Sequence, residues 1–65
     1  MKPGDKLKDN DPRCEGRVLE IIDTGSYYRH VVARAPSGRE VTILKRRIYS
    51  DGKPRKSGFD LVKAN

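Results

Sequence analysis

The chain has 65 residues, with 15 Lys or Arg against 9 Asp or Glu and a formal net charge of +6 at pH 7. This length predicts a single domain over residues 1–65 and excludes a second one. Leu, Ile, Val and Phe make up about 22% of the residues, just above the composition typical of disordered chains. One cysteine and one histidine exclude an intramolecular disulfide and a Cys/His zinc site.

Residues 1–11 contain no apolar segment of the kind found in secretory signals, and no apolar run approaches the roughly 20 residues of a membrane helix. The sequence therefore predicts a cytoplasmic protein with no membrane contact, no metal and no cofactor. The supply of apolar side chains is small, so we expect modest stability and either a monomer or a weak dimer.

The first expected elements are an extended stretch over residues 2–7 and a polar loop over residues 8–13. Asp9, Asn10 and Asp11 in this loop suggest a calcium site, but Pro12 and the missing downstream glycine and glutamate break the required spacing. A turn capped by its own aspartates, with ion pairs to Arg13 or Arg17, is the favoured interpretation.

Residues 17–23 form the next predicted strand, because the run is rich in β-branched residues and ends at a Thr-Gly-Ser turn. A helix is the rival interpretation, and the shortness of the run argues against it. Val18, Leu19, Ile21 and Ile22 do not follow strict alternation, which predicts a β-bulge or a strand shared by two faces of a bent sheet.

Two further strands are predicted over residues 27–35 and 39–44, joined by a tight hairpin at Pro36, Ser37 and Gly38. Val41 and Ile43 should point inward. After them, Leu44 and Ile48 flank three cations, a spacing that fits one helical turn. A loop over residues 50–54 then leads to a last strand over residues 58–63, in which Phe59 is expected to fill the core.

These elements predict an all-β fold, a small and strongly bent five-stranded barrel that resembles the SH3-like barrels, with a one-turn helix before the last strand. Residues 2–7 (Lys-Pro-Gly-Asp-Lys-Leu) and 15–21 (Glu-Gly-Arg-Val-Leu-Glu-Ile) resemble the KOW motif of ribosomal and transcription-elongation proteins, which implies RNA binding. The loop between these two parts is acidic here, unlike the basic loop of that family. The whole chain also resembles small uncharacterised proteins of bacterial phages and prophages, in its length and in the pattern over residues 11–21, which implies a bacterial host cell.

The positive charge is concentrated in the second part of the chain. Residues 1–25 carry a net charge of −1 and residues 26–65 a net charge of +7. A surface of this kind attracts phosphate, although the same cations also keep a small domain in solution. Tyrosines beside the cations can stack on bases or simply close the ends of the barrel. The candidate nucleic-acid-binding residues are Tyr28, Arg29, Arg34, Lys45, Arg46, Arg47, Tyr49, Lys53, Arg55 and Lys56.

The predicted function is a non-enzymatic binding module for RNA or DNA with little sequence specificity. An enzyme is disfavoured because His30 and Cys14 have no catalytic partner at a recognisable spacing. The alternative is a phage or mobile-element accessory protein whose basic face, or an exposed strand edge, binds an acidic surface of a host protein.

Overall fold

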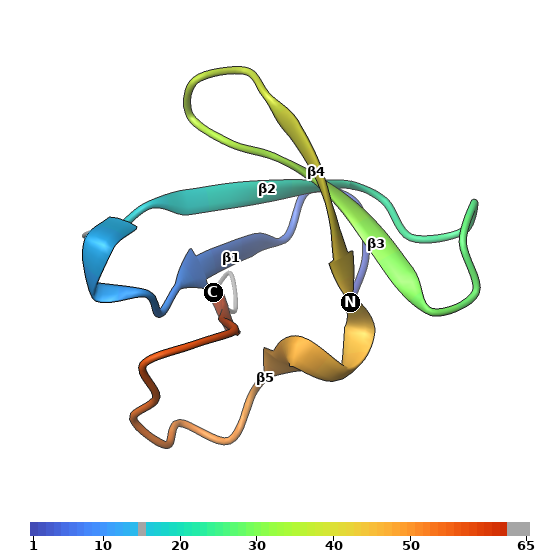
Figure 1. Cartoon of the computed structure of the whole chain (residues 1–65). Coiled ribbons are helices and arrows are strands. Elements are labelled where there is room, and N and C mark those ends of the chain that lie inside the picture. The colour runs from blue at the N-terminus through green and yellow to red at the C-terminus, as the bar shows by residue number, and fades with distance from the viewer. Residues whose placement is uncertain (15, 63–65) are drawn as a thin grey trace.

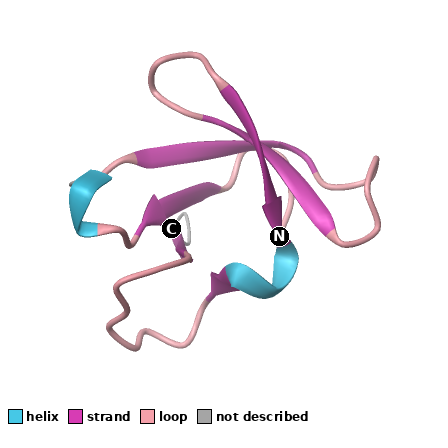
Figure 2. Ribbon diagram, viewed as in Figure 1, coloured by secondary structure: helices cyan, strands magenta, loops and turns pink. Residues whose placement is uncertain are grey.

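The computed structural model describes residues 1–14 and 16–62, and within them the protein is all-β (Figure 1). The chain forms six strands and two three-residue 3-10 helices, η1 and η2, separated by turns and loops (Figure 2). In chain order the elements are β1 Lys6–Asp9, η1 Pro12–Cys14, β2 Val18–Asp23, β3 His30–Arg34, β4 Glu40–Leu44, η2 Lys45–Arg47, β5 Ile48–Tyr49 and β6 Phe59–Val62.

The strands form one curled sheet, a half-barrel, in the order β4-β3-β2-β1-β6-β5. All neighbours are antiparallel except β5 and β6, which run parallel. The prediction of five strands is wrong, because β5 adds a sixth strand, and the curled half-barrel has β4 and β5 at its two ends. The predicted helical turn is present as η2, but β5 separates it from the last strand. Ile48 leaves η2 with an extended backbone and pairs with Phe59, a long-range contact that local sequence does not encode.

The core lies on the concave side of the sheet and follows the period-2 alternation of the strands. Leu7 faces Leu19 across β1 and β2, and Val31 faces Ile43 across β3 and β4. Each large aliphatic side chain buried in this way contributes about 1.5 to 3 kcal/mol. The buried cluster is Leu7, Leu19, Ile21, Val31, Ala33, Ala35 and Ile43.

Phe59 does not fill the core as expected. It is only partly buried and packs against the aliphatic cluster together with Val41, Ile48 and Leu61. The fully buried side chains come from β1, β2 and β3, whereas β6 is flanked on its outer side, among the described strands, only by the two-residue strand β5.

The predicted bulge in the strand over residues 17–23 is confirmed. Ile21 pairs with Ala33, but Asp23 pairs with Val32, so the register of β2 against β3 shifts at Ile22. Leu19 and Ile21 point into the core by ordinary alternation, and the extra residue follows them at Ile22, where the strand bends. Val18, on the opposite face of β2, is 43% exposed.

The boundaries of three predicted strands change. The strand expected over residues 27–35 begins only at His30, because the Asp23 side chain accepts hydrogen bonds from the amides of Gly25 and Ser26 and holds a loop before it. The extended stretch expected over residues 2–7 becomes β1 and reaches Asp9, inside the predicted loop. The last strand ends at Val62, and residue 63 lies outside the described part of the chain.

The turn predicted after β1 is confirmed. Asp9 Oδ1 accepts a 3.0 Å hydrogen bond from the amide of Asp11, and Asp11 Oδ1 accepts one of 2.9 Å from the amide of Arg13. Arg13 pairs with Asp11, and Arg17 pairs with the buried Asp9. The aspartates of this loop are therefore occupied by backbone amides and guanidinium groups.

Candidate functional site

The open end of the β3–β4 hairpin brings together residues that lie on either side of it in the sequence. The amide of Lys45 donates a 2.9 Å hydrogen bond to the carbonyl oxygen of Arg29, just beyond the last paired residues of the two strands. Tyr28 and Arg29 directly precede β3, and Lys45 and Arg46 directly follow β4. Together with Leu44 they line a groove of about 610 Å³, and these five residues are called the hairpin-end patch below.

The cations of the hairpin-end patch are not neutralised by neighbours. Arg29 and Arg46 are exposed and Lys45 is half-buried. None of the three forms an ion pair with a residue of the described ranges 1–14 and 16–62, whose five salt bridges all lie elsewhere. The patch therefore keeps a local positive potential that an anionic ligand can use.

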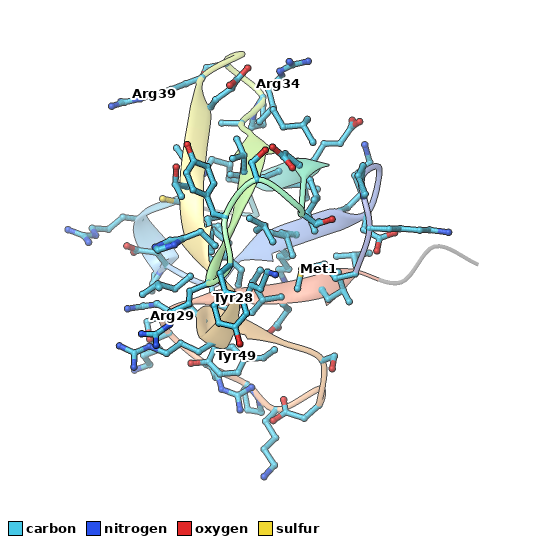
Figure 3. All side chains as sticks on the ribbon, turned by 90° about the vertical axis from the view of Figure 1, so that its right-hand side faces the viewer. Met1, Tyr28, Arg29, Arg34, Arg39 and Tyr49 are labelled. Atoms are coloured by element: carbon cyan, nitrogen blue, oxygen red, sulfur yellow. The ribbon has the colours of Figure 1, made fainter. Side chains whose placement is uncertain are left out.

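Tyr28 supplies a free aromatic surface beside these cations. Its side chain is 91% exposed, the most exposed of the large hydrophobic residues in the described chain. Figure 3 shows it beside Arg29. The neighbouring Tyr27 is half-exposed and packs edge-on against His30, with ring centroids 6.4 Å apart. Of this pair of tyrosines, Tyr28 is the one that presents its ring to a ligand.

Arg34 does not join the hairpin-end patch. It lies at the other end of β3, where Figure 3 shows it with Arg39, far from Tyr28 and Arg29. Its guanidinium lies 3.5 Å from the carboxylate of Glu40, its cross-strand neighbour. The structure thus separates Arg29 from Arg34, although both are candidate nucleic-acid-binding residues predicted from sequence.

Arg55 and Tyr49 form a unit of their own. Arg55 makes two hydrogen bonds to the carboxylate of Asp51, of 2.6 and 2.7 Å, and its guanidinium carbon lies 3.7 Å from the centroid of the Tyr49 ring. The bonds from Arg55 and from the Lys53 amide hold the pKa of Asp51 well below its ordinary value. This arrangement covers one face of the Tyr49 ring and pairs the Arg55 charge.

The remaining predicted cations lie outside the hairpin-end patch. Lys53 and Lys56 are exposed on the loop between β5 and β6. Arg47, the last residue of η2, borders a separate groove of about 430 Å³ beside β4. Arg17, His30 and Phe59 also line that groove. None of these three was among the candidate site residues.

Pairing across the hairpin is the signal that would have grouped these residues from sequence. A tight turn at residues 36–38 sets Arg34 opposite Glu40 and His30 opposite Leu44. Counting further along the same register sets Arg29 opposite Lys45, as observed. The same count shows that Arg34 belongs to the turn end of the hairpin and not to the open end.

Comparison of the chain with protein-family models, with curated proteins and with solved structures finds no match. The resemblances to the KOW motif and to small phage proteins therefore stay predictions from sequence. Within residues 1–14 and 16–62, no helix is long and apolar enough to cross a membrane.

Proposed function

We propose that this protein is a nucleic-acid-binding module that uses the hairpin-end patch. The observation that carries the proposal is the placement of the exposed Tyr28 ring beside Arg29, Lys45 and Arg46, cations that no described carboxylate neutralises. Cations next to an open aromatic ring suit a ligand that offers phosphates and flat bases together. A plain polyanion would use the charges and leave the ring without a role.

Binding of this kind has little sequence specificity. The helices of the described chain have three residues each, too short to enter a major groove and read base edges. Three cations neutralise about three phosphates, so the affinity should fall by roughly 2 to 3 log units for each log unit of added salt. Arg47, Lys53 and Lys56 extend the positive field around the patch, and Arg55 supports Tyr49.

The fold is proposed to be an SH3-like small barrel. Four successive antiparallel strands, β1 to β4, are followed by the short helix η2, and β6 then returns to pair with β1. This order supports the predicted resemblance. A sheet so bent presents loops at its ends, which are the usual binding surfaces of rigid scaffolds.

The test is a titration of fluorescent oligonucleotides, single-stranded and duplex, at low and at moderate salt. The patch variant carries Arg29→Gln, Lys45→Gln and Arg46→Gln. The control variant carries Lys8→Gln, Arg34→Gln and Arg39→Gln, which removes the same charge from exposed positions outside the patch. We expect the patch variant to lose about tenfold or more in affinity and to show a shallower salt slope than the control.

Two results would remove the proposal. One is the absence of binding by the unmodified protein at low salt. The other is an equal loss of affinity in both triple variants, since that would mean that total charge and not the patch determines binding.

A further inference from the structure

The free edge of β4 is a second surface with a defined chemistry. β4 is the end strand of the sheet and pairs only with β3 among the described strands. The amide of Ala35 donates a hydrogen bond to the carbonyl oxygen of Arg39, and the amide of Lys45 donates one to the carbonyl oxygen of Arg29. The main-chain groups of the odd-numbered residues from 39 to 45 therefore point toward β3. Because these groups alternate in an antiparallel ladder, the N–H and C=O groups of Glu40, Thr42 and Leu44 point away from the sheet.

Two of the devices that usually protect an edge strand, proline and a β-bulge, are absent from β4. β4 contains no proline, and its pairing with β3 continues without a bulge from Glu40 to Leu44. The charge of Glu40 is directed to Arg34. An edge of this kind is a ready template for another strand.

The groove of about 430 Å³ lies beside the same edge. Part of its lining is apolar, from Val41, Leu44 and Phe59, and part is cationic, from Arg47 and Arg17. Arg17 is held by Asp9, whereas Arg47 forms no ion pair with a residue of the described chain. Apolar lining and an uncompensated cation lie together next to unpaired main-chain groups.

We propose that the β4 edge binds an extended, acidic segment of a partner protein as an added strand. Main-chain donors and acceptors that repeat every second residue, about 6.8 Å apart, match another peptide backbone. A nucleic-acid backbone offers acceptors but no matching row of donors. Apolar residues of the segment would contact Phe59 and Val41, and its acidic residues would face Arg47.

Charge argues against a second copy of this chain as the occupant. Each copy carries a formal charge of +6, and the residues next to the edge include Arg39, Lys45, Arg46 and Arg47. Bringing two such edges together places like charges side by side. An acidic segment would instead neutralise the cations next to the edge.

The probe is a capped synthetic peptide of about nine residues that alternates glutamate and valine. Two further peptides test the two parts of the proposal: one with lysine in place of glutamate, and one with the same acidic sequence but a methyl group on every backbone nitrogen, which removes the N–H donors of both of its edges. Nuclear magnetic resonance follows binding to the full chain. We expect the acidic peptide to bind and to slow hydrogen exchange at the amides of Thr42 and Leu44, and the other two peptides to bind about tenfold more weakly or not at all.

A matched pair of variants tests the edge itself. Thr42→Pro removes an outward N–H that β3 does not use, which an edge strand tolerates. Thr42→Val removes only the side-chain hydroxyl. Proline should weaken peptide binding about tenfold or more and valine should change it little. If Thr42→Pro unfolds the protein, the N-methylated peptide still tests main-chain pairing at the β4 edge, because that experiment uses the unmodified protein.

Several outcomes would overturn this proposal. They are equal binding of the N-methylated and unmodified peptides, protection of Thr42 by an oligonucleotide instead of the peptide, and concentration-dependent pairing of the chain through β4. The test of nucleic-acid binding is independent of these outcomes. The patch variant should still show slowed exchange at Thr42 with the peptide, at reduced affinity because Lys45 and Arg46 lie next to the edge, whereas Thr42→Pro should bind oligonucleotides with unchanged affinity.

Discussion

Arg17 donates a hydrogen bond of 2.6 Å to the carboxylate of Asp9. Of the five ion pairs in the described chain, this is the one with a buried carboxylate. The Asp9 side chain is 6% exposed, and that of Arg17 is 37% exposed. The bond ties the end of β1 to the residue that precedes β2. It therefore fixes the connection between these strands.

Replacing Asp9 with asparagine should lower the free energy of unfolding by about 1 to 3 kcal/mol. Loss of one partner of a buried pair costs about 3 to 5 kcal/mol, and the partial exposure of Arg17 reduces that figure. Urea unfolding measures the change. Asp11→Asn is the control, since Asp11 pairs with the exposed Arg13 and its removal should change stability little. Equal effects of the two substitutions would contradict this account.

The same pair makes stability depend on acid. Burial by itself raises the pKa of Asp9, but the amide of Asp11 and the guanidinium of Arg17 outweigh burial and hold the pKa below its ordinary 3.8. Because the folded pKa is below the unfolded one, the stabilisation is complete above about pH 5 and is lost as the pH falls through 3.8 toward the folded value. Urea unfolding from pH 7 to pH 3 should show this loss, and Asp9→Asn should show less of it. A parallel pH dependence in both proteins would refute the assignment.

Alanine substitutions at Gly58 and Gly52 distinguish the cost of backbone strain from the cost of steric crowding. Both have φ of +75°, but a Cβ on Gly58 would lie 2.6 Å from Tyr49 Cε2 and 2.8 Å from the carbonyl oxygen of Arg47, whereas one on Gly52 meets nothing within 4 Å. Gly52→Ala should cost about 1 kcal/mol from the left-handed backbone. Gly58→Ala should cost about 2 to 4 kcal/mol, since overpacking adds to that strain. Thermal unfolding of the two variants gives the comparison, and a smaller loss at Gly58 would show that the β5–β6 contact is looser than described.

Leu19 and Val18 are neighbours on β2 that face opposite sides of the sheet. Leu19 is fully buried and Val18 is 43% exposed. Leu19→Ala should lower the free energy of unfolding by about 2 to 5 kcal/mol because it leaves a cavity in the core. Val18→Ala should change it by less than about 1 kcal/mol. Chemical denaturation of both variants tests the direction of β2, and the reverse order of effects would mean that the strand is shifted by one residue.

Tyr28 and Tyr27 are also neighbours with different exposure, and alanine substitutions at the two positions test the proposed binding surface. Tyr28→Ala should weaken binding of single-stranded oligonucleotides by about 5-fold to 100-fold, the range expected for loss of one stacked base, with little effect on stability. Tyr27→Ala should lower stability slightly, because Tyr27 packs on His30, and should affect binding less. Fluorescence anisotropy gives the affinities. Binding that is insensitive to Tyr28 would leave charge alone as the basis of the interaction.

Local chemistry explains which features of the fold were predictable. Alternation of apolar residues predicts β4, and β-branched residues followed by a turn predict β2. The irregular pattern Val18, Leu19, Ile21 and Ile22 predicts the bulge that the register confirms. The turn at residues 36–38 follows from its proline and glycine. A turn capped by its own aspartates, with ion pairs to Arg13 or Arg17, was predicted because short aspartate side chains bond to amides and cations close by in sequence. The structure determines which aspartate pairs with which arginine.

Only the tertiary structure determined how the cations are divided. Arg34, Arg55 and the hairpin-end cations look alike in sequence, yet Glu40 pairs with Arg34 and Asp51 pairs with Arg55 while Arg29, Lys45 and Arg46 keep their charges free of described partners. Strand β5 and the open edge of β4 are likewise set by pairing between distant segments. Local residue preferences fix where a strand bends or turns, but the register and curvature of the whole sheet decide which charges meet and which main-chain groups are left unpaired.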